Sequence, residues 1–152
     1  DVVYVIAGTG PDVQRLRDKA KGLGVADRVV FTGLVSDAEK ADHYRLADVF
    51  AMPGSGVGFD RYPLRFVFLE AMACGVPVVG SRPERDDEVK NDGSLLAAQV
   101  DPKDPDDIVR GILSALSKRE RQVPGGIERY AFPEFQRRFH GIIDDMIARS
   151  RG

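Results

Sequence analysis

The sequence predicts an α/β protein built on an open, doubly wound parallel sheet of the Rossmann-like type. Short runs of β-branched residues alternate along the chain with segments of helical apolar spacing, which is the pattern of successive βα units. The first run, Val2–Ala7, is apolar at nearly every position, as expected of a strand buried on both faces. A length of 152 residues suffices for one domain with a sizeable core, so we treat residues 1–152 as one domain.

Each predicted element has a local signal. Apolar runs bounded by Gly, Pro or polar residues predict strands over residues 2–7, 28–32, 48–52, 76–80 and 94–98. Gly8-Thr9-Gly10 supplies a tight turn after the first strand, and Pro11 is suited to the first position of a helix. That helix has an apolar stripe at helical spacing, formed by Val13, Leu16 and Ala20.

The later helices are marked by capping residues and apolar faces. Ser36 and Glu39 form a capping-box signal for a helix over residues 37–46. A helix over residues 64–74 ends at Gly75, and Asp104 caps another that has Pro105 in its first turn. In that helix we expect four residues to face the sheet: Ile108, Ile112, Leu113 and Leu116. The last helix, over residues 133–149, is expected to bury Phe135, Phe139, Ile142, Ile143, Met146 and Ile147.

Composition excludes several classes of protein. The chain has 22 Lys+Arg against 24 Asp+Glu, and this near balance argues against a nucleic-acid binder. Apolar runs reach only about six residues, whereas a membrane-spanning helix needs ~20. The single cysteine, Cys74, excludes an internal disulfide and fits a reducing compartment. No Cys/His/Asp cluster has metal-ligand spacing, so we expect no metal site. The chain opens directly on a strand-like run without an initiator Met, so we expect it to be part of a longer polypeptide.

The Gly8-Thr9-Gly10 turn has two readings. In a doubly wound sheet, ligands bind at the carboxyl ends of the strands, and glycines there let backbone N–H groups approach a phosphate. However, Val13 occupies the place of the third small residue of a dinucleotide fingerprint. A purely steric turn between strand and helix is the more frequent reading of such a pair of glycines.

Glu70 is the most informative single residue of the sequence. It lies in the first half of a predicted helix whose other residues are almost all apolar. Burying its charge without a partner would cost several kcal/mol, so we expect a designated partner. The vicinal hydroxyls of a ribose suit a bidentate acceptor, while the alternative is that Glu70 caps nearby N–H groups or pairs with an arginine.

The segment around Glu70, Leu69-Glu70-Ala71-Met72-Ala73-Cys74-Gly75-Val76-Pro77-Val78-Val79, resembles the hallmark segment of retaining glycosyltransferases of family 4. Other parts follow in the order of that family: the strand with Gly-x-Gly, residues 27–33, residues 44–49 leading to Pro53, and Glu88-Val89 ahead of Gly93. The resemblance covers essentially the whole chain. It implies the C-terminal, donor-binding half of a GT-B enzyme, which works with an N-terminal acceptor-binding domain of the same polypeptide.

The resemblance also implies roles for individual residues. Glu70 would hold the ribose hydroxyls of a nucleotide-diphosphosugar. Gly8 and Gly10 would line the diphosphate, and the loop of Gly33, Leu34 and Val35 would contact the nucleobase. Glu88 matches a glutamate of the family, although a solvated surface charge is an equal reading.

Two positions depart from the family pattern. Tyr62 stands where the family has the first glutamate of its Glu-x7-Glu segment, the expected ligand of the donor hexose, and Asp60 could substitute for it. Arg65 replaces a glycine that lets the helix approach the diphosphate, so Arg65 either obstructs that approach or contributes a guanidinium contact.

The leading functional hypothesis is the donor half of a hexosyltransferase that acts with retention and without a metal or other cofactor. The donor would be a UDP- or GDP-linked sugar and the acceptor a polysaccharide or glycolipid, and the chain would be inactive by itself. The resemblance implies a cytoplasmic enzyme, with peripheral attachment of the intact protein to the inner face of the membrane. The alternative is a degenerate domain that serves as an interaction or regulatory module without turnover.

Overall fold

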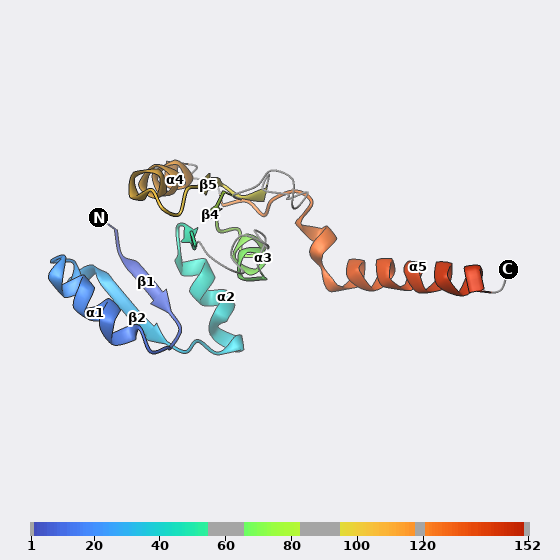
Figure 1. The fold of residues 1–152 in the computed structure, drawn as a ribbon, viewed down its shortest axis with the longest axis horizontal. Helices are drawn as coiled ribbons and strands as arrows, with labels where there is room; N and C mark the ends of the chain where they lie inside the picture. Colours follow the sequence, from blue (N-terminus) through green and yellow to red (C-terminus); the bar gives the residue numbers. More distant parts are fainter. Residues whose placement is uncertain (1, 55–65, 83–94, 118–120, 151–152) are drawn as a thin grey trace. The chain divides into compact units, whose positions relative to one another are not determined.

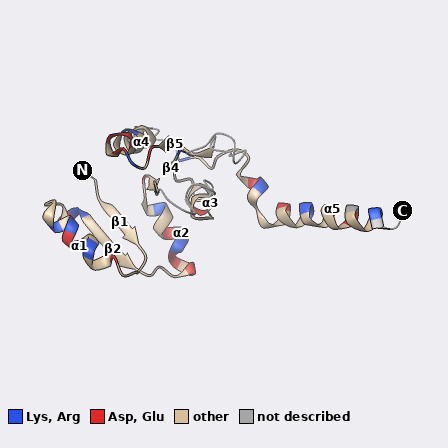
Figure 2. Ribbon diagram, viewed as in Figure 1, with Lys and Arg blue, Asp and Glu red and all other residues tan. Residues whose placement is uncertain are grey.

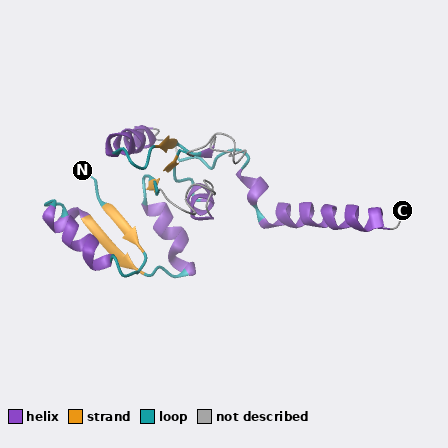
Figure 3. Cartoon of the chain, viewed as in Figure 1, coloured by secondary structure: helices purple, strands orange, loops and turns teal. Residues whose placement is uncertain are grey.

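The computed structural model describes residues 2–54, 66–82, 95–117 and 121–150 (Figure 1). The chain divides into two compact units, Asp1–Lys40 and Ala41–Gly152. Both units contain parallel strands connected by helices, and Figure 3 shows this alternation along the chain. The predicted α/β class with parallel pairing is therefore confirmed.

The first unit is a βαβ motif. Strand β1 (Tyr4–Ala7) is followed by helix α1 (Val13–Gly22), the 3₁₀ turn η1 (Ala26–Arg28) and strand β2 (Val29–Gly33). The two strands pair in parallel, with Tyr4 opposite Val29 and Ile6 opposite Phe31. Helix α1 contacts this pair of strands through a cation–π interaction. The Arg17 guanidinium lies 4.4 Å from the centre of the Phe31 ring.

The second unit contains a sheet with the strand order β3-β4-β5, in which both neighbouring pairs are parallel. Helix α2 (Asp37–Leu46) begins in the first unit and continues into the second. The elements that follow it, in chain order, are β3 (Phe50–Ala51), α3 (Phe66–Ala73), β4 (Val78–Ser81), β5 (Ala98–Val100), α4 (Pro105–Ser117), η3 (Ile127–Tyr130) and α5 (Phe132–Ser150).

Strand β4 separates two apolar clusters, because successive side chains of a strand point to opposite faces. Val78 belongs to the cluster formed with residues of α3, namely Phe68, Ala71 and Met72. Val79 belongs to the cluster formed with Val100 and with Ala115 of α4. Helices therefore cover both faces of this sheet, which is the doubly wound arrangement that the sequence predicts.

Helix α4 begins where the sequence places it, and Ile108 and Ile112 pack against the sheet as predicted, whereas Leu113 does not. The Asp104 carboxylate accepts hydrogen bonds from the backbone N–H groups of Asp106 and Asp107, at 2.9 and 3.2 Å, so the predicted cap is confirmed. Leu113 is 58% exposed, so the prediction that it faces the sheet is wrong. Gly111 and Ala115 are buried instead, since the approach of α4 to the sheet leaves room only for small residues there.

Three further predictions need correction. The fifth strand is Ala98–Val100 rather than residues 94–98, because Leu95 and Leu96 are buried in the core cluster of α3 ahead of the strand. The first helix begins at Val13, after the cap residue Asp12, rather than at Pro11. Strand β1 is mostly exposed rather than buried on both faces, because the described first unit has one complete helix, α1, to cover its two strands.

Helix α5 has the predicted position but not the predicted burial. Its apolar residues are exposed, with Met146 at 63% and Phe135 at 59%, so the prediction that this face is buried is wrong. The rings of Phe132, Phe135 and Phe139 stack on one another along the helix, with centroids 6.4 and 6.1 Å apart. The spacing of apolar residues thus places them on one face of the helix, but it does not determine whether another element covers that face.

Charges of both signs are distributed over the helices rather than collected on one of them. Figure 2 shows lysine and arginine next to aspartate and glutamate on α1, α2 and α5. Several of these are surface pairs within one helix, such as Lys40 with Asp37 and Arg45 with Asp42. On α3, by contrast, Glu70 is the only charged residue among Phe66–Ala73.

Candidate nucleotide-sugar site

The carboxyl ends of β3 and β4 are tied together by a serine. The Ser81 hydroxyl, at the end of β4, donates to the Gly54 carbonyl at 2.7 Å and accepts from the Gly54 N–H at 2.8 Å. Gly54 directly follows Pro53, at the end of the segment that continues β3. In sheets of this type, ligands bind at these strand ends, so Ser81 holds the backbone of Gly54 at the expected site.

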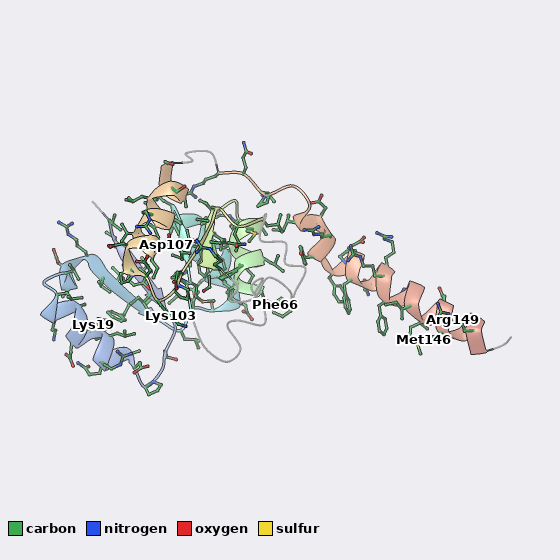
Figure 4. The ribbon with its side chains drawn as sticks, turned by 45° about the horizontal axis from the view of Figure 1, so that its top comes forward. Lys19, Phe66, Lys103, Asp107, Met146 and Arg149 are labelled. Carbon is green, nitrogen blue, oxygen red and sulfur yellow. The ribbon has the colours of Figure 1, made fainter. Side chains whose placement is uncertain are left out.

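Helix α3 presents Glu70 beside the core of the second unit. Its sequence is apolar apart from Glu70, and Phe68, Ala71 and Met72 are almost fully buried, at 3%, 0% and 1% exposure. Glu70 itself is half-buried. Phe66, which Figure 4 labels at the start of the helix, is 85% exposed. The helix therefore has a buried face that anchors it, with the carboxylate at the border of that face.

One partner of Glu70 within the chain is a tyrosine of another helix. The Tyr44 hydroxyl, from α2, donates to Glu70 Oε2 at 2.8 Å, and both side chains are partly buried. Burial, and then the hydrogen bond to the Glu70 carboxylate, raise the pKa of the Tyr44 phenol above its ordinary value. As alternatives to a ribose, the sequence indicates an arginine or backbone N–H groups, and it does not single out the hydroxyl of Tyr44.

A carboxylate can accept several hydrogen bonds at once. An ionised carboxylate has two oxygens and about four lone-pair sites. Because Tyr44 is 26 residues away from Glu70 in the sequence, local spacing carries no signal for this pair. The only available signal was the presence of Tyr44 in the Tyr-Arg-Leu-Ala-Asp stretch that carries part of the family resemblance.

A second tie holds the end of α2. The Arg121 guanidinium donates to the carbonyl oxygens of Arg45 and Ala47, at 2.6 and 3.2 Å, and lies 3.4 Å from Asp48 Oδ1. The last carbonyls of a helix have no partner within the helix, so a cation is favourable there. This tie fixes the segment that carries Tyr44.

In the first unit, the structure brings Gly8 and Gly33 together at the carboxyl ends of β1 and β2. The Gly8 N–H donates to the Gly33 carbonyl at 2.7 Å. Both residues have positive φ, +125° and +74°, which explains the glycines by backbone conformation. Gly10 has no such conformation, and a Cβ there would meet nothing within 4 Å. Leu34 is 83% exposed and Val35 is half-buried.

The remaining predicted site residues are placed as follows. Gly8, Gly10, Gly33, Leu34 and Val35 belong to the first unit and Glu70 to the second. Four others, Asp60, Tyr62, Arg65 and Glu88, lie outside the described residues.

Across residues 2–54, 66–82, 95–117 and 121–150, no group of three His, Cys, Asp or Glu residues could hold a metal ion. No helix in these same ranges has the length and apolar character needed to cross a bilayer. That the reaction needs no metal stays a prediction.

Comparison with known proteins gives a consistent family. The family model "Glycosyl transferases group 1" matches residues 1–118. The chain is 38% identical over 145 residues to the GDP-mannose-dependent alpha-(1-6)-phosphatidylinositol monomannoside mannosyltransferase of Mycolicibacterium smegmatis. This match covers 93% of this chain and 38% of that protein. It is 42% identical over 128 residues to the protein of the same name from Mycobacterium tuberculosis, covering 80% of this chain and 32% of that protein. The chain thus spans well under half of these relatives.

Solved structures show the same fold. The chain superposes on the apo form of the lipopolysaccharide outer core galactosyltransferase WaaB with a TM-score of 0.71 and 22% sequence identity. The match covers 95% of this chain and 41% of that one.

Proposed function

This chain belongs to the group 1 glycosyltransferase family, and on that premise we propose that it forms the donor-binding part of a hexosyltransferase. The intact enzyme would transfer a sugar from a nucleotide diphosphate to a polysaccharide or glycolipid acceptor. An N-terminal acceptor-binding domain of the same polypeptide would complete it, and the part described here would not catalyse transfer alone.

The observation that carries this proposal is the half-buried carboxylate of Glu70, on an otherwise apolar helix of a doubly wound unit. Its position in the sequence matches the family residue that holds the ribose. The Tyr44 hydroxyl donates to one oxygen of this group, and a carboxylate is a suitable acceptor for the vicinal hydroxyls of a ribose.

The relatives direct the choice of donor. Both reported relatives are named as GDP-mannose-dependent mannosyltransferases that act on a phosphatidylinositol mannoside, a glycolipid. We therefore propose GDP-mannose as the first donor to test, with UDP-linked hexoses as the second. The acceptor class also supports a cytoplasmic enzyme attached peripherally to the inner face of the membrane.

The proposed reaction retains the configuration at the anomeric carbon and needs no metal ion. The contribution of the protein would be to position the donor and to stabilise the negative charge that develops on the departing diphosphate. Backbone N–H groups near Gly8 and Gly10 are the described groups proposed for the diphosphate. Arg65 is the side chain proposed to contact it, and Asp60 and Tyr62 are proposed to lie near the hexose.

Calorimetric titration of the intact protein with GDP-mannose and UDP-glucose tests the proposal. We expect saturable binding of one of them. Glu70→Ala should weaken that binding by about 10- to 100-fold, because hydrogen bonds to a charged group contribute about 1.5–3 kcal/mol. Glu134→Ala is the matched control, since Glu134 pairs with arginines of its own helix, and it should leave the affinity unchanged.

The same titration separates the alternative. If neither nucleotide sugar binds the folded protein, the enzymatic proposal is wrong and a module without turnover is favoured. If a nucleotide sugar binds and Glu70→Ala leaves its affinity unchanged, the assignment of Glu70 to the donor fails.

A further inference from the structure

Helix α2 supplies a hydroxyl that is fixed against the Glu70 carboxylate. Tyr44 Oη donates to Glu70 Oε2 at 2.8 Å across two helices that are separate in sequence. A glutamate side chain has several rotatable bonds, and anchoring one of its oxygens selects among its rotamers. The direction of the second oxygen is then restricted as well.

The Tyr44 ring is itself held by aromatic packing at the edge of the core. It packs edge-on against Phe50, with ring centroids 5.6 Å apart and an interplanar angle of 64°. Phe50 packs in the same manner against Phe68, at 6.0 Å and 71°. Phe68 is only 3% exposed and lies two residues before Glu70 on α3. The aromatic contacts therefore connect the hydroxyl back to the helix that carries the carboxylate.

A second contact joins the same two helices about one turn away. The Cys74 thiol, just after α3, lies 3.8 Å from the Ala41 carbonyl of α2. Ala41 is three residues before Tyr44, about one helical turn away. The spacing of α2 and α3 is thus set at more than one point, and Tyr44 does not depend on Glu70 alone for its place.

We propose that Tyr44 is a positioning residue that orients the Glu70 carboxylate toward the vicinal hydroxyls of the donor ribose. This inference rests on the proposed function and adds to it the residue that organises the ribose contact. An acceptor held in place before binding loses less conformational freedom when the nucleotide arrives. Tyr44 therefore acts on the ribose only through Glu70.

The test compares each nucleoside diphosphate with its 2′-deoxy form. The intact protein is titrated with GDP and 2′-deoxy-GDP, and with UDP and 2′-deoxy-UDP in parallel. The variant Tyr44→Phe removes only the hydroxyl and keeps the ring against Phe50. Tyr130→Phe is the matched control, because Tyr130 lies in η3 and its ring contacts Arg129.

The wild-type protein should prefer the ribonucleotide by about tenfold or more, since the deoxy form leaves an acceptor of the site without its donor. Tyr44→Phe should weaken ribonucleotide binding about fivefold and leave the deoxy form within about twofold, so that the preference narrows. Tyr130→Phe should leave both affinities and their ratio unchanged. In a Glu70→Ala background, adding Tyr44→Phe should change the ribonucleotide affinity by less than about twofold, as expected for two residues that act in series.

The outcomes separate the two levels of inference. If the wild-type protein binds no nucleoside diphosphate, or binds the ribose and 2′-deoxyribose forms equally well, the proposed function fails. If it distinguishes them and Glu70→Ala removes the preference while Tyr44→Phe keeps it in full, the positioning role is wrong and the proposed function stands. Urea unfolding of each variant shows whether the fold is lost. If Tyr44→Phe loses the fold, the milder Phe50→Leu, which weakens the packing against the Tyr44 ring, should narrow the preference for the ribonucleotide over the deoxy form.

Discussion

Glu70 shows how far a single residue can be interpreted from its neighbours in the sequence. A charge among apolar residues requires a partner, and the structure supplies the Tyr44 hydroxyl. The identity of that partner depends on the packing of α2 against α3 and on the aromatic contacts beneath it. Residue type thus indicated the need for a partner, and the tertiary contact decided which residue meets it.

The glycines of the first unit differ in a way that a substitution can measure. Gly33 has φ of +74°, so Gly33→Ala should lower the free energy of unfolding by about 1–2 kcal/mol, because an L-residue is strained in the left-handed region. Gly10→Ala should leave it within about 0.5 kcal/mol, since Gly10 has neither a positive φ nor neighbours near its Cβ position. Urea unfolding of both variants measures the difference.

Gly10→Ala also distinguishes the two readings of the Gly8-Thr9-Gly10 turn. If Gly10 lines the diphosphate, the variant should weaken GDP binding by about tenfold while keeping wild-type stability, because a Cβ hinders the approach of a phosphate to the backbone. An unchanged GDP affinity would leave the steric turn as the sufficient explanation of this glycine.

At the scale of elements, α4 shows why amphipathic spacing alone misplaces a residue such as Leu113. Leu113 fits the helical stripe in the sequence, yet α4 approaches the sheet along Gly111 and Ala115. A Cβ added to Gly111 would lie 2.3 Å from Val100 Cγ1, so the sheet and the helix are in contact there. Small residues mark the closest approach of two elements, while large apolar residues can lie beside it.

Gly111→Ala is therefore expected to destabilise the protein in spite of the better helix propensity of alanine. Overpacking costs about 1–3 kcal/mol, against a gain of about 1 kcal/mol from propensity. Gly141→Ala in α5 is the matched control, because a Cβ there meets nothing within 4 Å. It should stabilise by up to about 1 kcal/mol, and thermal or urea unfolding compares the two. Equal effects of the two substitutions would contradict the close approach of α4 to β5.

At the scale of the whole molecule, long-range ties hold segments that the sequence gives no reason to connect. The Arg121 guanidinium donates hydrogen bonds to carbonyls at the end of α2 that lie more than 70 residues earlier in the sequence, and Arg45 is 76 residues away. The side chain is about half exposed, so its ion pair with Asp48 adds little, and the hydrogen bonds to carbonyls dominate.

Arg121→Gln should consequently lower the free energy of unfolding by about 1–2 kcal/mol, because it removes a charged donor from two helix-terminal carbonyls. Arg137→Gln, which removes an exposed pair within α5, should change it by less than about 0.5 kcal/mol. Urea unfolding provides the measurement, and indistinguishable losses for the two variants would show that the Arg121 contacts do not contribute.

The sequence by itself determined the α/β class, the order of most elements, the cap at Asp104 and the family. These features depend on local periodicity, on turn residues and on motifs that lie within a few neighbouring positions. Only the tertiary structure decided the Tyr44–Glu70 bond, the face that α4 buries, the place of β5 and the exposure of β1 and α5. Those features depend on which surfaces meet in space, and the periodicity of one segment contains no information about the surface that another segment presents to it.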